Sequence, residues 1–146
     1  MTTDSNGEHI QRGVPDIGYL DPGVFDDLGI VQTAVVRDTV YVSGIAPLTG
    51  GAQGMDIVGV TFAEQLAYTL EVLDRSLQSV GAGRCDLVAW TIYTTDMQAL
   101  ADSAAALKQW VGPHPPTSTW VTVAGLIHPA QLLELTAIAA RSTVHS

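Results

Sequence analysis

The sequence predicts an α+β domain in which two helices cover one face of a mixed β-sheet. Two stretches, residues 61–80 and 96–111, carry apolar side chains at helical spacing along a single stripe. The segments around them are short and rich in β-branched residues, as strands are. Each helix has one apolar face to bury, so two layers account for the pattern. The 146 residues, 47% of them hydrophobic, suit one domain without a disulfide framework.

The first 28 residues form an irregular N-terminal arm in this prediction, and residues 29–146 form the folded domain. The arm is acidic and is interrupted by several glycines and by Pro15 and Pro22. Apolar residues near its end could still attach it to the body of the protein. These are Tyr19, Leu20, Val24 and Phe25.

A β-hairpin should open the domain. Residues 30–36 and 39–44 are both β-branched, and the polar pair Arg37-Asp38 separates them. A glycine-rich loop over residues 49–54 and a short edge strand over residues 55–60 should follow.

The first helix should start at Thr61, where Thr61 and Glu64 are spaced as a capping box. Its apolar stripe consists of Phe62, Leu66, Leu70, Leu73, Leu77 and Val80. Gly81 and Gly83 can end the helix, and residues 87–94 then have the composition of a buried strand.

Asp96 should cap the second helix, whose inner face would carry Leu100, Ala104, Leu107 and Val111. Two further extended segments, residues 118–126 and 132–140, complete the chain around a turn at 127–130. The helices leave one face of the sheet uncovered. We therefore expect a homo-oligomer with clefts between its subunits.

Composition disfavours several kinds of partner. Six basic against fifteen acidic residues give a net charge of −9, which repels nucleic acids and anionic membranes. Cys85 is the one cysteine, and the four histidines have no metal-ligand spacing, so no metal is expected. The first nine residues lack a secretory signal, and no apolar run is long enough to span a membrane. We therefore expect a cytoplasmic location.

Glu134 is the candidate catalytic residue. It is the one carboxylate in the apolar closing strand, where an unpaired buried charge would cost several kcal/mol. One interpretation is a glutamate that reaches water at the edge of the sheet. The other is a general acid or base that holds a water molecule in a cleft.

Three segments resemble, in order, the RidA (YjgF-like) reactive-intermediate deaminase family. Residues 39–47 (TVYVSGIAP) are similar to its strand and "SGQxP" turn. Residues 80–96 are similar to its "AGxxxxDVVKxTVFVxD" element. Residues 116–121 and 133–139 are similar to its closing "PARSxV" and "xEIEAIA" pair. The resemblance covers residues 29–141 and leaves the arm outside.

This resemblance implies a chorismate-mutase-like fold that assembles as a trimeric barrel, with sites between neighbouring subunits. Family members typically hydrolyse enamines or imines made by pyridoxal-phosphate enzymes to keto acids and ammonia, without a metal or an organic cofactor. Glu134 matches the glutamate that orients water. Gly44 matches the turn glycine whose backbone faces the substrate, beside Ile45.

The sequence departs from the family pattern at three positions near the pocket. Ser118 replaces the arginine that grips the substrate carboxylate, and a hydroxyl cannot form that bidentate ion pair. Trp120 replaces a smaller residue, and Ile30 replaces a tyrosine. These changes favour a less anionic and more apolar substrate, with Trp90 and Trp120 as stacking surfaces if they face the cleft.

The resulting hypothesis is a divergent RidA-like hydrolase or deaminase for an imine, enamine or related unsaturated small molecule. Glu134 would orient the water, and Ser118, Thr119 and the backbone near Gly44 would bind the substrate. Two alternatives stay open. One is a biosynthetic or catabolic tailoring enzyme, such as an aminomuconate-type deaminase or a lyase, and the other is a non-catalytic trimer that binds a small molecule.

Overall fold

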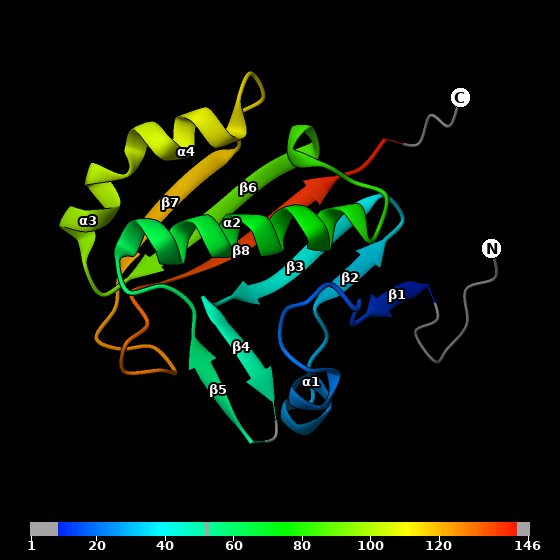
Figure 1. Ribbon diagram of the computed structural model, residues 1–146. Helices are drawn as coiled ribbons and strands as arrows, with labels where there is room; N and C mark the ends of the chain where they lie inside the picture. The colour runs from blue at the N-terminus through cyan, green and yellow to red at the C-terminus, as the bar shows by residue number, and fades with distance from the viewer. Residues whose placement is uncertain (1–8, 52, 143–146) are drawn as a thin grey trace.

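A six-stranded sheet with helices on one face forms the body of the protein (Figure 1). The structure is a computed structural model that describes residues 9–51 and 53–142. The strand order is β1-β2-β3-β8-β6-β7, antiparallel except for β6 with β7. These strands are β1 (Ile10–Gly13), β2 (Thr33–Val36), β3 (Thr39–Ile45), β6 (Leu87–Thr94), β7 (Thr117–Thr122) and β8 (Leu133–Ala140). The predicted α+β class and mixed sheet are confirmed.

Helix α2 (Phe62–Gln78) lies across the sheet and packs on β3 and β8 (Figure 1). Its capping box forms as predicted, because the Thr61 hydroxyl accepts from the Glu64 amide while the Glu64 carboxylate accepts from the Thr61 amide. Leu73 and Leu77 are completely buried against the sheet. The single apolar stripe therefore defines which face of the helix is inside.

The second helix is divided into α3 (Met97–Asp102) and α4 (Ala104–Val111). The break falls at Ser103, whose hydroxyl donates to the carbonyl oxygen of Ala99 in the preceding turn. Leu100, Leu107 and Val111 are buried as expected, but Ala104 is exposed. The prediction of one continuous inner face is wrong at Ala104, which directly follows the break at Ser103.

Regular structure occurs where an irregular arm was expected, although residues 1–8 lie outside the described part of the chain. β1 pairs with β2 and extends the sheet, and helix α1 (Pro22–Leu28) follows. The arm is attached by Tyr19 and Phe25, whose rings meet edge to face with centroids 6.2 Å apart in the core. The attachment that the apolar residues suggested is therefore present.

The predicted short strand is present, but it pairs with part of the predicted glycine-rich loop in a separate two-stranded sheet. β4 (Leu48–Gly51) pairs with β5 (Gly54–Ile57), and Leu20 bridges to Gly50. Gly50 and Gly54 have φ values of 103° and 124°, which favour glycine and allow the tight reversal. This hairpin and α1 lie together below the main sheet in Figure 1.

Within the described part of the chain, no further layer covers the face of the main sheet that points away from α2 (Figure 1). β8 alternates between buried residues on the helix side and more exposed residues on the open side. Tyr41 and Ile138 stand on the open side with exposed fractions of 48% and 38%. Within the described residues, no helix has the length and apolar character needed to cross a membrane.

Candidate functional site

Glu134 is the second residue of β8 and lies on the open face of the sheet, the face that points away from α2. Its neighbours Leu133 and Leu135 are completely buried on the helix side, so strand alternation directs the Glu134 side chain to the opposite face. The pairing of β3 with β8 shifts register between Val42 and Ile45. Such irregularities redirect side chains, and this one places Ser43 and Gly44 beside the carboxylate.

The carboxylate of Glu134 fits against Gly44. A β-carbon at Gly44 would lie 2.6 Å from Oε2, closer than such atoms approach. The other oxygen, Oε1, accepts a hydrogen bond of 3.3 Å from the side-chain amide of Gln131. Gln131 and Gly44 therefore fix the position of the carboxylate, one at each oxygen. Any larger residue at position 44 would displace the Glu134 side chain.

Glu134 lines a cavity of about 390 Å³ between the sheet, α1 and the loop before β8. Its wall is mostly apolar and includes no lysine, arginine or histidine. The lining residues are Tyr19, Leu20, Val24, Phe25, Leu28, Ile30, Ser43, Gly44, Ala46, Leu48, Met55, Leu126, Ile127 and Glu134. Glu134 is thus the one charged group in an apolar pocket of a size that suits a small organic molecule.

Tyr19 contributes a second polar group to this cavity. Its hydroxyl oxygen accepts a hydrogen bond of 2.9 Å from the Ala46 amide. Burial raises the pKa of Tyr19 to about 12, with a smaller contribution from the nearby negative charge of Glu134 and against the lowering effect of the Ala46 hydrogen bond. The phenol therefore stays protonated at neutral pH.

The structure places six of the predicted site residues in two separate cavities. Glu134, Gly44 and Ile30 share the cavity just described. Ser118, Trp90 and Trp120 line a different hollow of about 200 Å³ beside α4. There the Trp90 indole donates to the Ser118 hydroxyl at 2.8 Å.

Trp90 therefore does not face Glu134. It is buried on the helix side of β6, where its ring stacks on Trp110 with centroids 5.9 Å apart. Ile45 is also fully buried in the core, and Thr119 is exposed on β7 at the edge of the sheet. Within one chain, none of these three lines the Glu134 cavity.

Sequence reasoning missed two walls of the cavity. One is the segment from Tyr19 to Leu28, and the other is the pair Leu126 and Ile127. The apolar residues of the arm were the available signal for the first wall. Nothing local marks the second, because its position depends on how the loop before β8 folds back.

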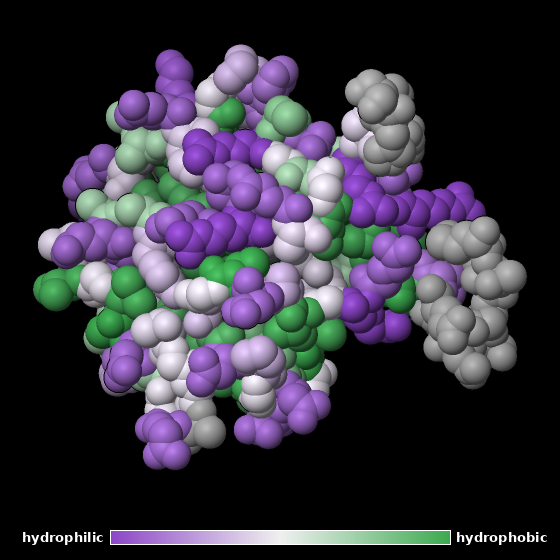
Figure 2. Space-filling view, turned by 45° about the vertical axis from the view of Figure 1, so that its right-hand side comes forward, coloured by the Kyte–Doolittle hydropathy of each residue, from purple (hydrophilic) through white to green (hydrophobic). Residues whose placement is uncertain are grey.

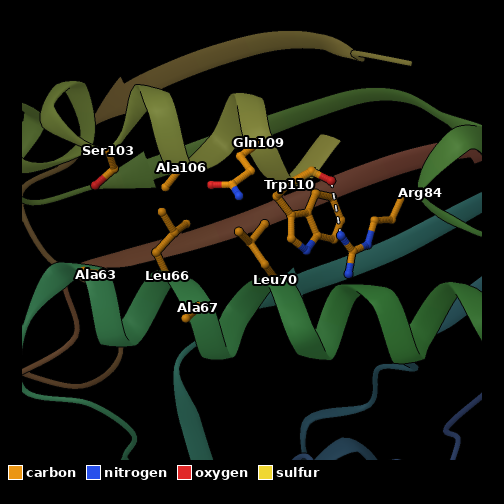
Figure 3. Close-up of a pocket in the computed structure, with 9 residues that line it drawn as sticks. All are labelled: Ala63, Leu66, Ala67, Leu70, Arg84, Ser103, Ala106, Gln109 and Trp110. Atoms are coloured by element: carbon orange, nitrogen blue, oxygen red, sulfur yellow. Dashed lines mark hydrogen bonds between the residues drawn. The ribbon is translucent and has the colours of Figure 1, made fainter. Parts of the chain in front are cut away.

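A larger hollow of about 490 Å³ lies on the helix side, between α2 and α4 (Figure 3). Figure 3 shows alanine and leucine side chains along it, together with Ser103 and Gln109, and Arg84 with Trp110 at one end. Arg84 lies over the Trp110 ring, donates to the Trp110 carbonyl oxygen and pairs with Asp74. Its charge is thus already neutralised, and the hollow has no pair of groups suited to acid-base chemistry.

No group of three or more metal-ligating side chains occurs among the residues that the structure describes. His114 and His128 lie on turns and line neither of the cavities that contain the predicted site residues. The chemistry that the described residues themselves can supply is therefore carboxylate chemistry at Glu134.

Comparisons with known proteins match this fold. The profile of the endoribonuclease L-PSP family matches residues 29–141. A Mycobacterium tuberculosis member of the YjgF/YER057c/UK114 family superposes with a TM-score of 0.75 at 22% identity, covering 90% of this chain and 98% of that chain. Yeast Mmf1 superposes with a TM-score of 0.78 at 19% identity, covering 91% and 99%.

A third solved structure has higher identity. It is a provisionally assigned endoribonuclease from Thermotoga maritima, 26% identical, with a TM-score of 0.76 and coverage of 90% of this chain and 98% of that one. No curated protein is similar enough to match.

Proposed function

The chain belongs to the endoribonuclease L-PSP family, and its structural neighbours include YjgF-family proteins. We propose that it hydrolyses small imines or enamines that carry no carboxylate group. One observation carries this proposal. A single carboxylate, Glu134, is oriented by Gln131 and Gly44 in a cavity whose other lining residues are uncharged.

Glu134 supplies the acid-base chemistry that the reaction needs. The carboxylate accepts a proton from a water molecule as the water oxygen bonds to the imine carbon. The same proton then passes to the nitrogen and gives the carbinolamine. Glu134 next takes the proton of the new hydroxyl group and delivers it to the amino nitrogen, so that the C–N bond breaks and a carbonyl compound and ammonia are released. Neither oxidation nor reduction occurs, so one carboxylate and one water are sufficient.

The lining residues support an apolar substrate. A substrate carboxylate would lie near Glu134 with no basic side chain of the cavity to neutralise it. Leucine, isoleucine, valine and phenylalanine side chains instead favour an alkyl or aryl group. We expect aliphatic or aromatic imines to be preferred over imino acids.

The names of some structural neighbours suggest RNA cleavage, but the charges of this protein support that function less well than imine hydrolysis. The chain has a net charge of −9, and the Glu134 cavity offers no cation for a phosphate. A nucleic-acid backbone would therefore be repelled from this site.

A homotrimer with sites between subunits is part of the proposal. Three apolar residues at the cavity, Leu28, Ile30 and Ile127, are 57%, 47% and 61% exposed. Figure 2 shows hydrophobic side chains reaching the surface among hydrophilic ones on the face in view. A neighbouring subunit that covered this mouth would exclude water and could bring Ser118 and Thr119 to the substrate.

The test compares two imines made in the assay. Benzaldimine comes from benzylamine and a flavin amine oxidase, and 2-iminobutyrate comes from threonine and a dehydratase. We expect the protein to shorten the lifetime of benzaldimine at least tenfold relative to buffer, with a smaller effect on 2-iminobutyrate. If neither lifetime changes while benzaldehyde, the product of benzaldimine hydrolysis, still binds, the protein is a non-catalytic binding protein and not the proposed enzyme.

A further inference from the structure

Tyr19 belongs to the Glu134 cavity although it lies before the residues that match the family, 29–141. The side chain is 7% exposed, and its ring is held between those of Phe25 and Tyr68, with centroid distances of 6.2 and 6.5 Å. Its position is therefore fixed by core packing.

The hydroxyl of Tyr19 has an unused proton. Its oxygen accepts from the Ala46 amide, and no group among the described residues accepts its hydrogen. The cavity's other polar side chains already have protein partners, since Ser43 donates to the Val31 carbonyl oxygen and Glu134 accepts from Gln131. A buried donor without an acceptor is costly, so the bound molecule is the natural acceptor.

We propose that the Tyr19 hydroxyl binds the substrate by donating a hydrogen bond to the lone pair of the imine nitrogen, in the cavity that also holds Glu134. This inference rests on the proposed function, and it adds a specificity residue from outside the matched segment. The same hydroxyl would donate to the carbonyl oxygen of the product. Tyr19 thus selects molecules that present one acceptor atom on an apolar body.

The role of Tyr19 leaves the proton balance at Glu134 unchanged. As the water oxygen bonds to carbon, the C=N π electrons move to nitrogen, which the phenol stabilises through its hydrogen bond. Tyr19 keeps its own proton, and the proton that nitrogen gains comes from water through Glu134. Because burial raises the pKa of Tyr19 to about 12, the phenol remains a donor throughout the neutral range.

The experiment compares Y19F with wild type and with the matched control Y68F. Tyr68 also hydrogen-bonds the backbone, donating to the Leu48 carbonyl oxygen at 2.9 Å, but it does not line the cavity. The probe is acetophenone, a stable ketone whose affinity is measured by NMR titration and whose C=O stretch is measured in the infrared.

We expect the acetophenone dissociation constant to rise about tenfold in Y19F and to stay within twofold in Y68F. The C=O stretch should shift to lower frequency on binding to wild type and Y68F but not to Y19F. Equal affinity and equal stretch in Y19F and wild type, or no binding to wild type, would overturn the proposal. If acetophenone binds as expected but no imine is hydrolysed, the proposed function fails while the role of Tyr19 stands.

A second measurement uses only sequences that retain Tyr19, in case Y19F does not fold. Tyrosine labelled with ¹³C at Cζ gives one resonance for each of the four tyrosines. Tyr41, Tyr68 and Tyr93 are identified by their phenylalanine variants, and the remaining resonance belongs to Tyr19. Acetophenone should shift this resonance most, and a larger shift at Tyr68 would contradict the proposal.

Discussion

The carboxylate of Glu134 occupies the space where a side chain at Gly44 would begin. A β-carbon there would be 2.6 Å from Oε2 and 3.2 Å from the carboxyl carbon. Gly44 does not have a positive φ, so its backbone conformation is open to other residues. The requirement for glycine at this position is therefore steric and belongs to the site rather than to the fold.

Gly44→Ala should reduce imine hydrolysis by about 100-fold, because moving a reacting group by about 1 Å can have that effect. The unfolding free energy should change by less than about 1 kcal/mol. Gly83→Ala is the matched control, since Gly83 also has an extended backbone and has nothing within 4 Å of an added β-carbon. Steady-state kinetics and urea unfolding of both variants check this expectation, and equal activity in the two would contradict it.

Glu134→Gln should lower kcat by about 100-fold or more, since general acid-base catalysis contributes on that order and an amide cannot take a proton from water. The fold should persist because Gln131 can still pair with the new side chain. Glu71→Gln serves as control, because Glu71 is an exposed residue of α2 that pairs with Arg75. The rates of benzaldimine loss distinguish the variants, and undiminished turnover by E134Q would exclude this role.

Gln65 connects α2 to the loop that precedes Glu134. Its buried amide donates to the Gly59 and Ala130 carbonyl oxygens and accepts from the Leu132 amide. Gln65→Leu should lower the unfolding free energy by about 3 kcal/mol, because buried backbone groups lose their partners. Gln98→Leu on the exposed side of α3 should cost less than about 0.5 kcal/mol. Urea denaturation measures both, and similar losses would show that the Gln65 bonds are unimportant.

Stability should fall between pH 10 and pH 12 because of Tyr19. Its folded-state pKa is about 12, against 10.0 ordinarily, so the unfolded chain releases this proton first as the pH rises. The stabilisation is complete below pH 10, amounts to about 3 kcal/mol, and is lost as the pH passes through 12. Y19F should lose less stability than wild type from pH 9 to pH 11 in urea unfolding. Burial also raises the pKa of Tyr68, and that contribution is present in both proteins.

Ser118→Arg tests whether this position sets substrate charge in the assembled protein. A guanidinium can pair with a carboxylate in two parallel hydrogen bonds, which the serine hydroxyl cannot do. The ratio of 2-iminobutyrate to benzaldimine turnover should therefore increase at least tenfold. Ser142→Arg adds the same charge just after β8, outside both cavities that hold the predicted site residues, and should leave the ratio unchanged. An unchanged ratio in S118R would remove Ser118 from the site.

The sequence pattern was sufficient to predict features that depend on one helix or one strand alone. The Thr61 and Glu64 spacing fixed the start of α2, and the apolar residues around Glu134 marked its carboxylate as a candidate site group. These features depend on residues a few positions apart. The break at Ser103 was not predicted, because the helical spacing of the apolar residues continues across this single serine.

The amino-acid sequence by itself determined the α+β class, the hairpin and the capped helix, and it marked Glu134 and Gly44 as candidate site residues. Only the tertiary structure showed that Tyr19 shares a cavity with Glu134 while Ser118, Trp90 and Trp120 lie in another. The physical reason is sequence separation. Tyr19 and Glu134 are 115 positions apart, and their meeting depends on how the arm packs under the sheet, which no periodicity within either segment encodes.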